Sequence, residues 1–242
     1  MANLAGPAHV LLAIVLAMLA GAIWAGIAGF LKATTGAHEV ISTIMLNWIA
    51  IYVGAYVFGQ GGPLQGSQPS APISATIVPS GVIKFFWGDQ TLGGVNVGFF
   101  VSLAMLVVFW AVLNRTTLGY EVRAVGYNPD AAAYGGISVR KNYIRAMAIS
   151  GGFAGLAGGI DMLGTYNSIG FGTLDVYGSS IGFLGIAVAL LGRNTALGTG
   201  IAAFLFGGLL YGTTHGLNTS AIPAQLTGNL TLIISSSWAP TS

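Results

Sequence analysis

The stretch HVLLAIVLAMLAGAIWAGIAGFL, from His9 to Leu31, has no Asp, Glu, Lys or Arg. It is long enough to cross a lipid bilayer as one helix, which takes about 20 mainly apolar residues. Charged residues make up only 6% of the whole chain of 242 residues and apolar residues 54%, whereas an ordinary soluble domain carries roughly 25% charged residues. The composition therefore indicates an integral membrane protein.

The composition also excludes several kinds of site. The chain has no cysteine, which excludes disulfide frameworks, thiolate metal sites and cysteine nucleophiles. Its formal net charge of +2 is too small for a nucleic-acid-binding surface, so we expect no nucleic-acid partner. The first apolar run is longer than a signal-peptide core and lacks a small-residue cleavage pattern, so we expect it to remain as a spanning helix.

Further apolar runs predict more spanning helices. The run Ser180–Leu191 is too short alone unless it borrows from the residues before it. Together the runs predict roughly six or seven spans. The expected fold is all-α, a polytopic transmembrane helical bundle with broken or short helices, in a single domain of residues 1–242. The additional runs are Val40–Gly59, Val97–Leu113, Tyr143–Leu163, Ser180–Leu191, Ala196–Thr213 and Ala224–Trp238.

The basic residues predict the orientation of the chain. Five of the eight Lys and Arg residues lie in or beside the loop 114–142. Because cytoplasmic loops carry an excess of these residues, this loop is expected on the cytoplasmic side. Residues 60–96 would then form an external loop, within which GVIKFFWG suits a segment lying at the membrane interface or a small packed plug. The five basic residues are Arg115, Arg123, Arg140, Lys141 and Arg145.

The centre of the cytoplasmic loop, EVRAVGYNPDAAAYGGISVRK from Glu121 to Lys141, predicts two short helices joined at a bend. In the second helix, Asn128 is the expected N-cap and Pro129 fits the first helical position. Asp130 places a negative charge in the first turn, where the helix dipole favours it.

The ends of these helices and their surroundings can also be predicted. Gly135 and Gly136 are expected to end the second helix, and Thr117 is the expected cap of the first. Helices below about 12 residues are marginal in water, so both need a packing partner. Anionic lipid could bind the basic residues. A protein partner fits better, because anionic lipid would repel Glu121 and Asp130.

The segment Gly119–Lys141 resembles the cytoplasmic coupling loop of permease subunits from bacterial ABC importers, in the class that takes up branched-chain amino acids, simple sugars and nucleosides. Two further stretches resemble the same permeases, and they lie in the expected order. The amino-acid sequences of these stretches are most similar to those of the nucleoside or simple-sugar branch. They are GAHEVISTIMLNWIAIYV (residues 36–53) and GFLGIAVALLGRNTALGTGIAAFLFGGLLYG (residues 182–212).

The resemblance implies a multi-pass permease of the bacterial inner membrane, paired with a second permease subunit. It implies cytoplasmic ABC ATPase subunits at the coupling loops and an extracytoplasmic substrate-binding protein. ATP and Mg would be bound by the partner ATPase, so we expect no cofactor, metal site or catalytic residue in this chain. The glycine-rich run Gly151–Gly159 lacks the Lys of a phosphate-binding loop. Its small-xxx-small spacing predicts a helix-contact face instead.

The chain departs from this branch in three respects. Its C-terminal span AQLTGNLTLIISSSW (residues 224–238) is more polar than a typical last helix. Members are usually longer, with additional helices ahead of the point at which this chain begins. His38 also stands where an Asn is expected before Glu39. The sequence leaves open whether the chain is truncated, whether another chain supplies those helices, and whether the permease pair is a homodimer or a heterodimer.

Transmission of force from an ATPase needs a small rigid helix that fits a groove and polar anchors that hold it there. Arg123 could instead pair within the loop with Glu121 or Asp130. The residues assigned to ATPase coupling are Glu121, Arg123, Gly126, Asn128, Pro129, Ala132, Gly136 and Ile137.

Polar residues inside spans are candidates for a solute path, because each is costly in hydrocarbon. Asn47 lies in the middle of a span, and Trp48, Tyr52 and Tyr56 recur every four residues and form one aromatic stripe. The stripe suits stacking against a base or a sugar face, or packing between helices. Further candidates, in the broken segment ahead of residue 180, are Tyr166, Asn167 and Asp175.

We therefore expect a permease subunit of an ATP-driven importer for a small polar solute, a nucleoside or a simple sugar. The alternative is a self-sufficient secondary transporter or channel, which would need buried ionisable residues. Only Asp161 and Asp175 are available for that role, and both lie near span ends. A third class, an intramembrane enzyme, would need a nucleophile paired with a general base, and the sequence offers no such pair. Both rivals predict activity without a partner ATPase.

Overall fold

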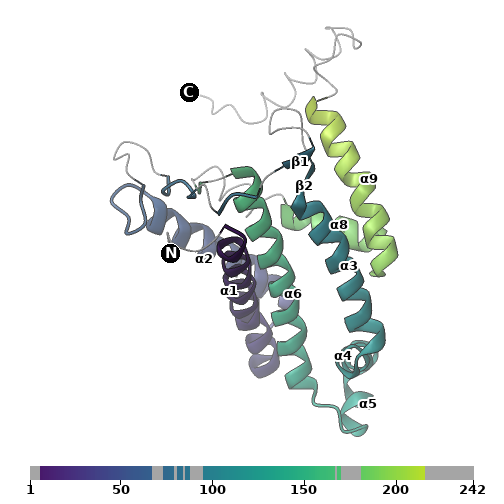
Figure 1. Cartoon of the computed structure of the whole chain (residues 1–242). Coiled ribbons are helices and arrows are strands. Elements are labelled where there is room, and N and C mark those ends of the chain that lie inside the picture. Colours follow the sequence, from purple (N-terminus) through teal and green to yellow (C-terminus); the bar gives the residue numbers. More distant parts are fainter. Residues whose placement is uncertain are drawn as a thin grey trace, which may run out of the picture. The chain divides into compact units, whose positions relative to one another are not determined.

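The computed structural model describes residues 6–66, 73–78, 81–83, 85–87, 95–166, 168–169 and 181–215. Helices dominate this part of the chain (Figure 1). Four of them are long and apolar enough to cross a membrane, and all four coincide with predicted runs. These helices are α1 (Gly6–Thr35), α2 (Glu39–Phe58), α3 (Val97–Arg115) and α6 (Val139–Asp161).

Shorter elements connect and follow the four long helices. The predicted pair of loop helices is present as α4 and α5, and α6 continues into a π-helical turn. Of the predicted run Ser180–Leu191, residues 182–191 form a short helix, and the predicted span Ala224–Trp238 lies outside the described residues. The shorter helices are α4 (Thr117–Tyr127), α5 (Pro129–Tyr134), η2 (Met162–Tyr166), α8 (Gly182–Leu191) and α9 (Ala196–His215).

A two-stranded antiparallel pair is an addition to the predicted all-α fold. Strand β1 (Phe85–Trp87) pairs with β2 (Val95–Asn96), with Phe85 opposite Asn96, Trp87 opposite Val95 and an irregularity between the two pairs. The aromatic part of GVIKFFWG, for which an interface segment or a packed plug was expected, thus forms a strand. The pair is too short to change the helical fold class.

The chain forms two compact units, Met1–Gly185 and Ile186–Ser242, with the boundary inside α8. In the second unit, a tight turn joins α8 to α9. The Thr195 hydroxyl donates to the Gly192 carbonyl oxygen at 2.9 Å and accepts from the Gly198 N–H at 3.2 Å. The hydroxyl therefore both closes the turn and caps the start of α9.

Helices α1 and α6 lie side by side within the first unit (Figure 1). Their backbones approach so closely that a Cβ on Gly21 would overlap the Gly151 carbonyl oxygen, and one on Gly155 would overlap the carbonyl oxygen of Ala17. The predicted helix-contact face of Gly151–Gly159 is thereby confirmed. Helices in lipid associate through small residues that admit the partner backbone.

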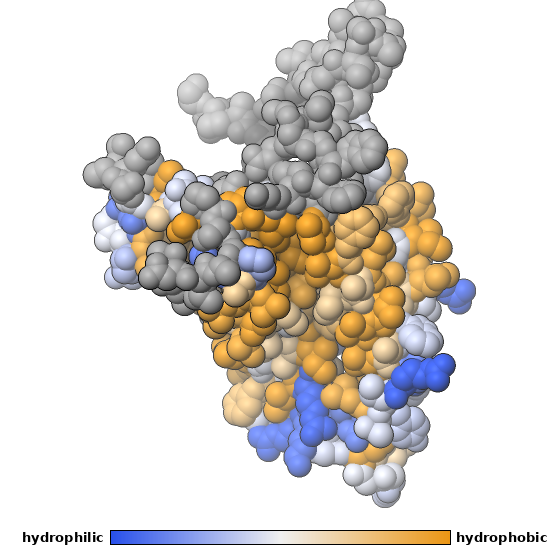
Figure 2. All heavy atoms as spheres, viewed as in Figure 1, coloured by the Kyte–Doolittle hydropathy of each residue, from blue (hydrophilic) through white to orange (hydrophobic). Residues whose placement is uncertain are grey.

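Large apolar side chains are exposed along the helices. Ile23 on α1 is 69% exposed and Val107 on α3 is 64% exposed. Figure 2 shows apolar side chains over much of the helical surface, with hydrophilic ones gathered towards the end that carries α4 and α5. Lipid is the solvent that suits such a surface, because the helices satisfy their backbone hydrogen bonds internally. The protein is an integral membrane protein, as its composition predicts.

Candidate functional site

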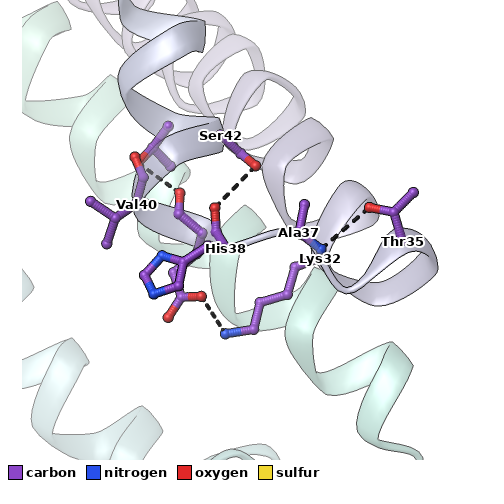
Figure 3. A network of polar contacts seen from close by, with 8 residues as sticks. Lys32, Thr35, Ala37, His38, Val40 and Ser42 are labelled. Atoms are coloured by element: carbon purple, nitrogen blue, oxygen red, sulfur yellow. Dashed lines mark hydrogen bonds and ion pairs between the residues drawn. The ribbon is translucent and has the colours of Figure 1, made fainter.

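Polar contacts join the end of α1 to the start of α2 (Figure 3). Lys32 Nζ, in the last turn of α1, donates to Glu39 Oε2 in the first turn of α2 at 2.7 Å. The same ammonium lies 4.8 Å from the ring centroid of Tyr143 on α6. A cation close to an aromatic ring is attracted to it, so Lys32 links three helices at this end.

The first loop helix, α4, begins with a side-chain cap one residue earlier than predicted. Thr116, not Thr117, is the N-cap, and its hydroxyl accepts from the Gly119 N–H at 3.1 Å. The bend from α3 into α4 is tight, because a Cβ on Gly119 would overlap the carbonyl oxygens of Val112 and Leu113. The angle at which the loop leaves α3 therefore depends on a glycine at position 119.

The second loop helix, α5, is built as the sequence predicts. Asn128 is its N-cap, and its side-chain oxygen accepts from the backbone N–H groups of Asp130 and Ala131, both at 3.0 Å. Pro129 occupies the first helical position, and the chain leaves the helix through Gly136, whose φ is +81°. These local bonds hold a helix that would be too short to persist alone.

The residues assigned to coupling divide into exposed and enclosed ones. Gly126, Asn128, Pro129 and Gly136 are exposed, and a Cβ on Gly126 would meet open space. Ile137 is partly buried. Ala132 is only 6% exposed, so it packs inside the loop and offers little surface to a partner.

Two tyrosines that the sequence analysis did not single out are the most exposed of the large hydrophobic side chains in the described residues. Tyr127 at the end of α4 is 91% exposed and Tyr134 at the end of α5 is 95% exposed. Each lies beside a bend rich in glycine or asparagine, and that position was the available signal. Exposed aromatic side chains are frequent anchors of protein interfaces.

Glu121 and Arg123 form their described contacts within the chain. Glu121 Oε2 accepts from Asn142 Nδ2 at 3.0 Å and lies 3.7 Å from Arg145 Nη1. Arg123 Nε donates to the Gly119 carbonyl oxygen at 3.2 Å, and Arg123 Nη1 to Asn114 Oδ1 at 3.4 Å. In the described residues, Arg123 thus bonds the bend between α3 and α4 instead of Glu121 or Asp130.

The candidate path residues on α2 are exposed, and Trp48 and Tyr52 belong to the aromatic stripe. The rings of Trp48 and Tyr52 lie 6.3 Å apart at an interplanar angle of 31°, and Tyr56 is 76% exposed. Asn47 is also exposed. The three aromatic residues lie on one side of α2, and Asn47 is turned about 100° from Trp48. None of the four lines the hollow between α1 and α2.

That hollow is open and apolar, with a volume of about 380 Å³. Since successive helical residues are turned by about 100°, Val53 and Val57, which line it, lie largely on the opposite side of α2 from Trp48. The rings of Trp48 and Tyr52 therefore lie away from the hollow, whereas Asn47 is three residues before Ala50 and seven before Gly54 and so lies on their side of the helix. The lining residues are Trp24, Ala50, Val53, Gly54, Val57 and Phe58.

The other path candidates lie at the end of α6. Tyr166 is the last residue of η2, and Asn167 and Asp175 lie outside the described residues. Just beyond η2, the Ile169 carbonyl oxygen accepts from the Ser74 N–H, and the Ile169 N–H donates to the Ser74 hydroxyl, both at 2.8 Å. Both backbone polar groups of Ile169 are thus hydrogen-bonded to the segment that follows α2.

A metal site would need several clustered donor groups. The part of the chain that the structure describes holds no group of three or more His, Asp or Glu side chains close enough to bind an ion.

The sequence comparison identifies the family. Residues 1–234 match the family model described as branched-chain amino acid transport system / permease component. The chain belongs to this permease family. The resemblance drawn from the three sequence stretches is confirmed.

Several curated relatives of this permease are named for the solutes they carry. It is 39% identical to the guanosine ABC transporter permease protein NupP of Bacillus subtilis, over 95% of the chain and 65% of the relative. It is 32% identical to the nucleoside ABC transporter permease protein NupB of Lactococcus lactis, over 92% of the chain and 61% of the relative.

An archaeal relative extends the comparison to a sugar. The permease is 31% identical to the glucose ABC transporter permease protein TsgB13 of Haloferax volcanii, over 93% of the chain and 60% of the relative. The chain thus spans between 60% and 65% of the length of these three relatives. No solved structure matches the permease.

Proposed function

We propose that this permease is the membrane subunit of an ATP-driven importer for a small polar solute, a nucleoside or a simple sugar. The observation that carries the proposal is the 39% identity, over 95% of the chain, to a guanosine ABC transporter permease. In this proposal a second permease subunit completes the pathway and an extracytoplasmic binding protein delivers the solute. Cytoplasmic ATPase subunits bind ATP and Mg and contact α4 and α5.

The geometry of the loop supports docking of an ATPase at α4 and α5. Side-chain caps at Thr116 and Asn128 fix both helices, so a push on the loop is not lost in unwinding. Gly126 and Pro129 leave room for a close approach, and Tyr127 and Tyr134 provide exposed aromatic area. We therefore place the ATPase contact on this exposed surface, with Ala132 supporting it from inside.

The aromatic stripe on α2 supports a path for a solute with a flat or ring-shaped face. Trp48 and Tyr52 present two exposed rings one helical turn apart, and Asn47 places an exposed amide on the neighbouring side of α2, about 100° from Trp48. Aromatic rings can stack on a nucleobase, and the amide can exchange hydrogen bonds with hydroxyl groups. We propose this surface as part of the solute path.

The rival function, an ion-coupled transporter or channel, receives less support from the described residues. Ion coupling uses ionisable side chains held inside the membrane. In the described ranges, the buried polar or charged residue is Asn142, an amide that does not titrate.

The test is uptake of a radiolabelled solute by cells that express the full-length gene product with its neighbouring ATPase and binding-protein genes. Labelled guanosine and labelled glucose are compared. We expect uptake of one of them that disappears when the phosphate-loop Lys of the ATPase is replaced. Uptake that survives this replacement would contradict the proposal and favour the ion-coupled rival.

A pair of substitutions at one position tests the docking surface. Gly126→Trp should abolish co-purification of the ATPase and reduce uptake together, because it places a bulky ring on the exposed face. Gly126→Ser is the matched control, since a Cβ there meets open space, and it should retain both. Ala132→Trp is unsuitable for this purpose, because Ala132 is buried and its replacement would disturb the loop itself.

A further inference from the structure

A buried polar contact joins the loop helix α4 to the first turns of α6. Asn142 is 2% exposed and is the largest fully buried side chain of the described residues. Its Nδ2 donates to Glu121 Oε2 at 3.0 Å and to the Ser138 carbonyl oxygen at 3.1 Å. One amide group therefore holds both the carboxylate of α4 and the N-terminal turn of α6.

Burying the Asn142 amide costs folding stability, and close packing alone does not account for an amide at this position. Asn142 Oδ1 is buried and has no hydrogen-bond partner among the described residues. Leaving a buried acceptor unsatisfied costs stability, whereas an apolar pair of similar shape can be nearly neutral. A residue chosen for stability alone at this position would be apolar, so the directional bond to Glu121 is the feature that needs explaining.

Helix α6 is connected onward to α1. One residue after Asn142, Tyr143 lies under the Lys32 ammonium, and a Cβ on Gly29 of α1 would come within 3.0 Å of Ile144 Cα. Further along, Gly21 and Gly151 meet backbone to backbone. Interlocked backbones have no flexible side chains between them to absorb a shift, so α1 must follow a displacement of α6.

We propose that Asn142 is a positioning residue that couples α4 to α6. It fixes Glu121, and with it α4, so that a displacement of the loop becomes a displacement of the α1 and α6 pair. The proposal rests on the proposed function, since it assumes that an ATPase moves the loop. In this proposal Glu121 does not contact the ATPase directly. It transmits the displacement of α4 to Asn142.

The first test replaces the polar pair by an apolar one, Glu121→Met with Asn142→Leu, in the complete complex. The apolar pair should pack, so ATPase co-purification and the thermal midpoint of the complex should be retained. Guanosine taken up per ATP hydrolysed should fall by about tenfold or more, since a hydrogen bond to a charged group contributes at least the energy of one factor of ten. A merely structural role predicts instead that this ratio follows the thermal midpoint.

The second test asks for rescue. Asn142→Asp alone sets two carboxylates against each other and should uncouple hydrolysis from uptake. Adding Glu121→Gln to Asn142→Asp restores a hydrogen bond in the reverse direction, because the Gln amide donates to the Asp carboxylate. Uptake per ATP should then recover only partly. Recovery is incomplete because the Asp carboxylate cannot donate to the Ser138 carbonyl oxygen.

The outcomes separate this inference from the proposed function. Native coupling in the apolar double variant, or no recovery in the Glu121→Gln/Asn142→Asp variant, would overturn the role of Asn142 and leave the importer function standing. If the native complex took up neither guanosine nor glucose in an ATP-dependent way, the proposed function would fail, and this inference with it.

Discussion

Helices are held in place by opposite means in two regions of the molecule. One region is the contact between α1 and α6, and the other is the loop that carries α4 and α5. Between α1 and α6, glycines let backbones touch, and Gly21 has Gly151 and Gly155 as its nearest neighbours. In the loop, side chains cap helix ends, as Asn128 does with two hydrogen bonds. One contact removes side chains and the other uses them.

The difference follows from the solvent of each region. In lipid, apolar side chains gain little from meeting each other, so close van der Waals contact and small residues drive association. At the aqueous end, the terminal N–H and C=O groups of a short helix have no partner within the helix. Water competes for these groups unless a side chain caps them. Four changes in the chain test this contrast, from the largest expected effect to the smallest.

Gly151→Ala should break the α1 and α6 contact. The new Cβ would overlap the Gly21 carbonyl oxygen, and overpacking of this kind costs about 1–3 kcal/mol, occasionally more. Gly158→Ala on the same helix is the control, since a Cβ there meets open space and alanine favours a helix by up to about 1 kcal/mol. Thermal unfolding in detergent should show a lower midpoint for the first variant only. Equal midpoints for Gly151→Ala and Gly158→Ala would show that Gly151 is not needed for the packing of α1 against α6.

Gly119→Ala should show that the same kind of close approach also fixes the loop. Its Cβ would overlap the carbonyl oxygens of Val112 and Leu113 at the bend into α4. We expect a loss of about 1–2 kcal/mol, less than in the long contact because the loop can shift outward. Proteolysis of the loop reports the change, and Gly126→Ala should leave the cleavage rate unaltered. A bend that tolerates alanine would mean that Gly119 does not set the angle.

Asn128→Ala should loosen α5 and leave the spanning helices unchanged. The substitution removes the acceptor for the N–H groups of Asp130 and Ala131, and loss of an N-cap costs about 1 kcal/mol. Hydrogen exchange at those two amides should accelerate, by about fivefold for that energy. Asn128→Asp keeps an acceptor and should keep the slow exchange. Fast exchange in the Asp variant would show that the cap is not what protects them.

Lys32→Met should have the smallest effect. The side chains of Lys32 and Glu39 are 26% and 43% exposed, and partly exposed ion pairs contribute about 0–1 kcal/mol. The contact with the Tyr143 ring is worth at most about 0.5–1 kcal/mol, and it shares the Lys32 ammonium with the ion pair, so the two contributions do not add in full. The thermal midpoint of the native protein should fall slightly with added salt, and that of Lys32→Met should not. The same salt dependence in both proteins would show that the contact contributes nothing measurable.

Much of the candidate loop could be predicted from the sequence because its determinants are local. Asn128, Pro129 and Gly136 act on N–H groups or on backbone angles within a few residues, and rules for caps and turns read such signals directly. The one local error, Thr117 for Thr116, is a shift of a single residue at a helix end, where boundaries are least certain. The exposure of Tyr127 and Tyr134 and the burial of Ala132 could not be read in this way, because each depends on how α4 and α5 turn relative to α6.

The sequence by itself determined the membrane environment, the four long helices and the capped loop, because apolar run length and cap residues act over short distances along the chain. Only the tertiary structure decided which glycines of α6 meet α1, that Glu121 bonds an Asn 21 residues away, and that Ser74 bonds Ile169 across 95 residues. The physical reason is that a hydrogen bond or backbone contact between distant segments depends on helix rotation and depth. Many faces of an apolar helix satisfy the same hydropathy, and packing selects one of them.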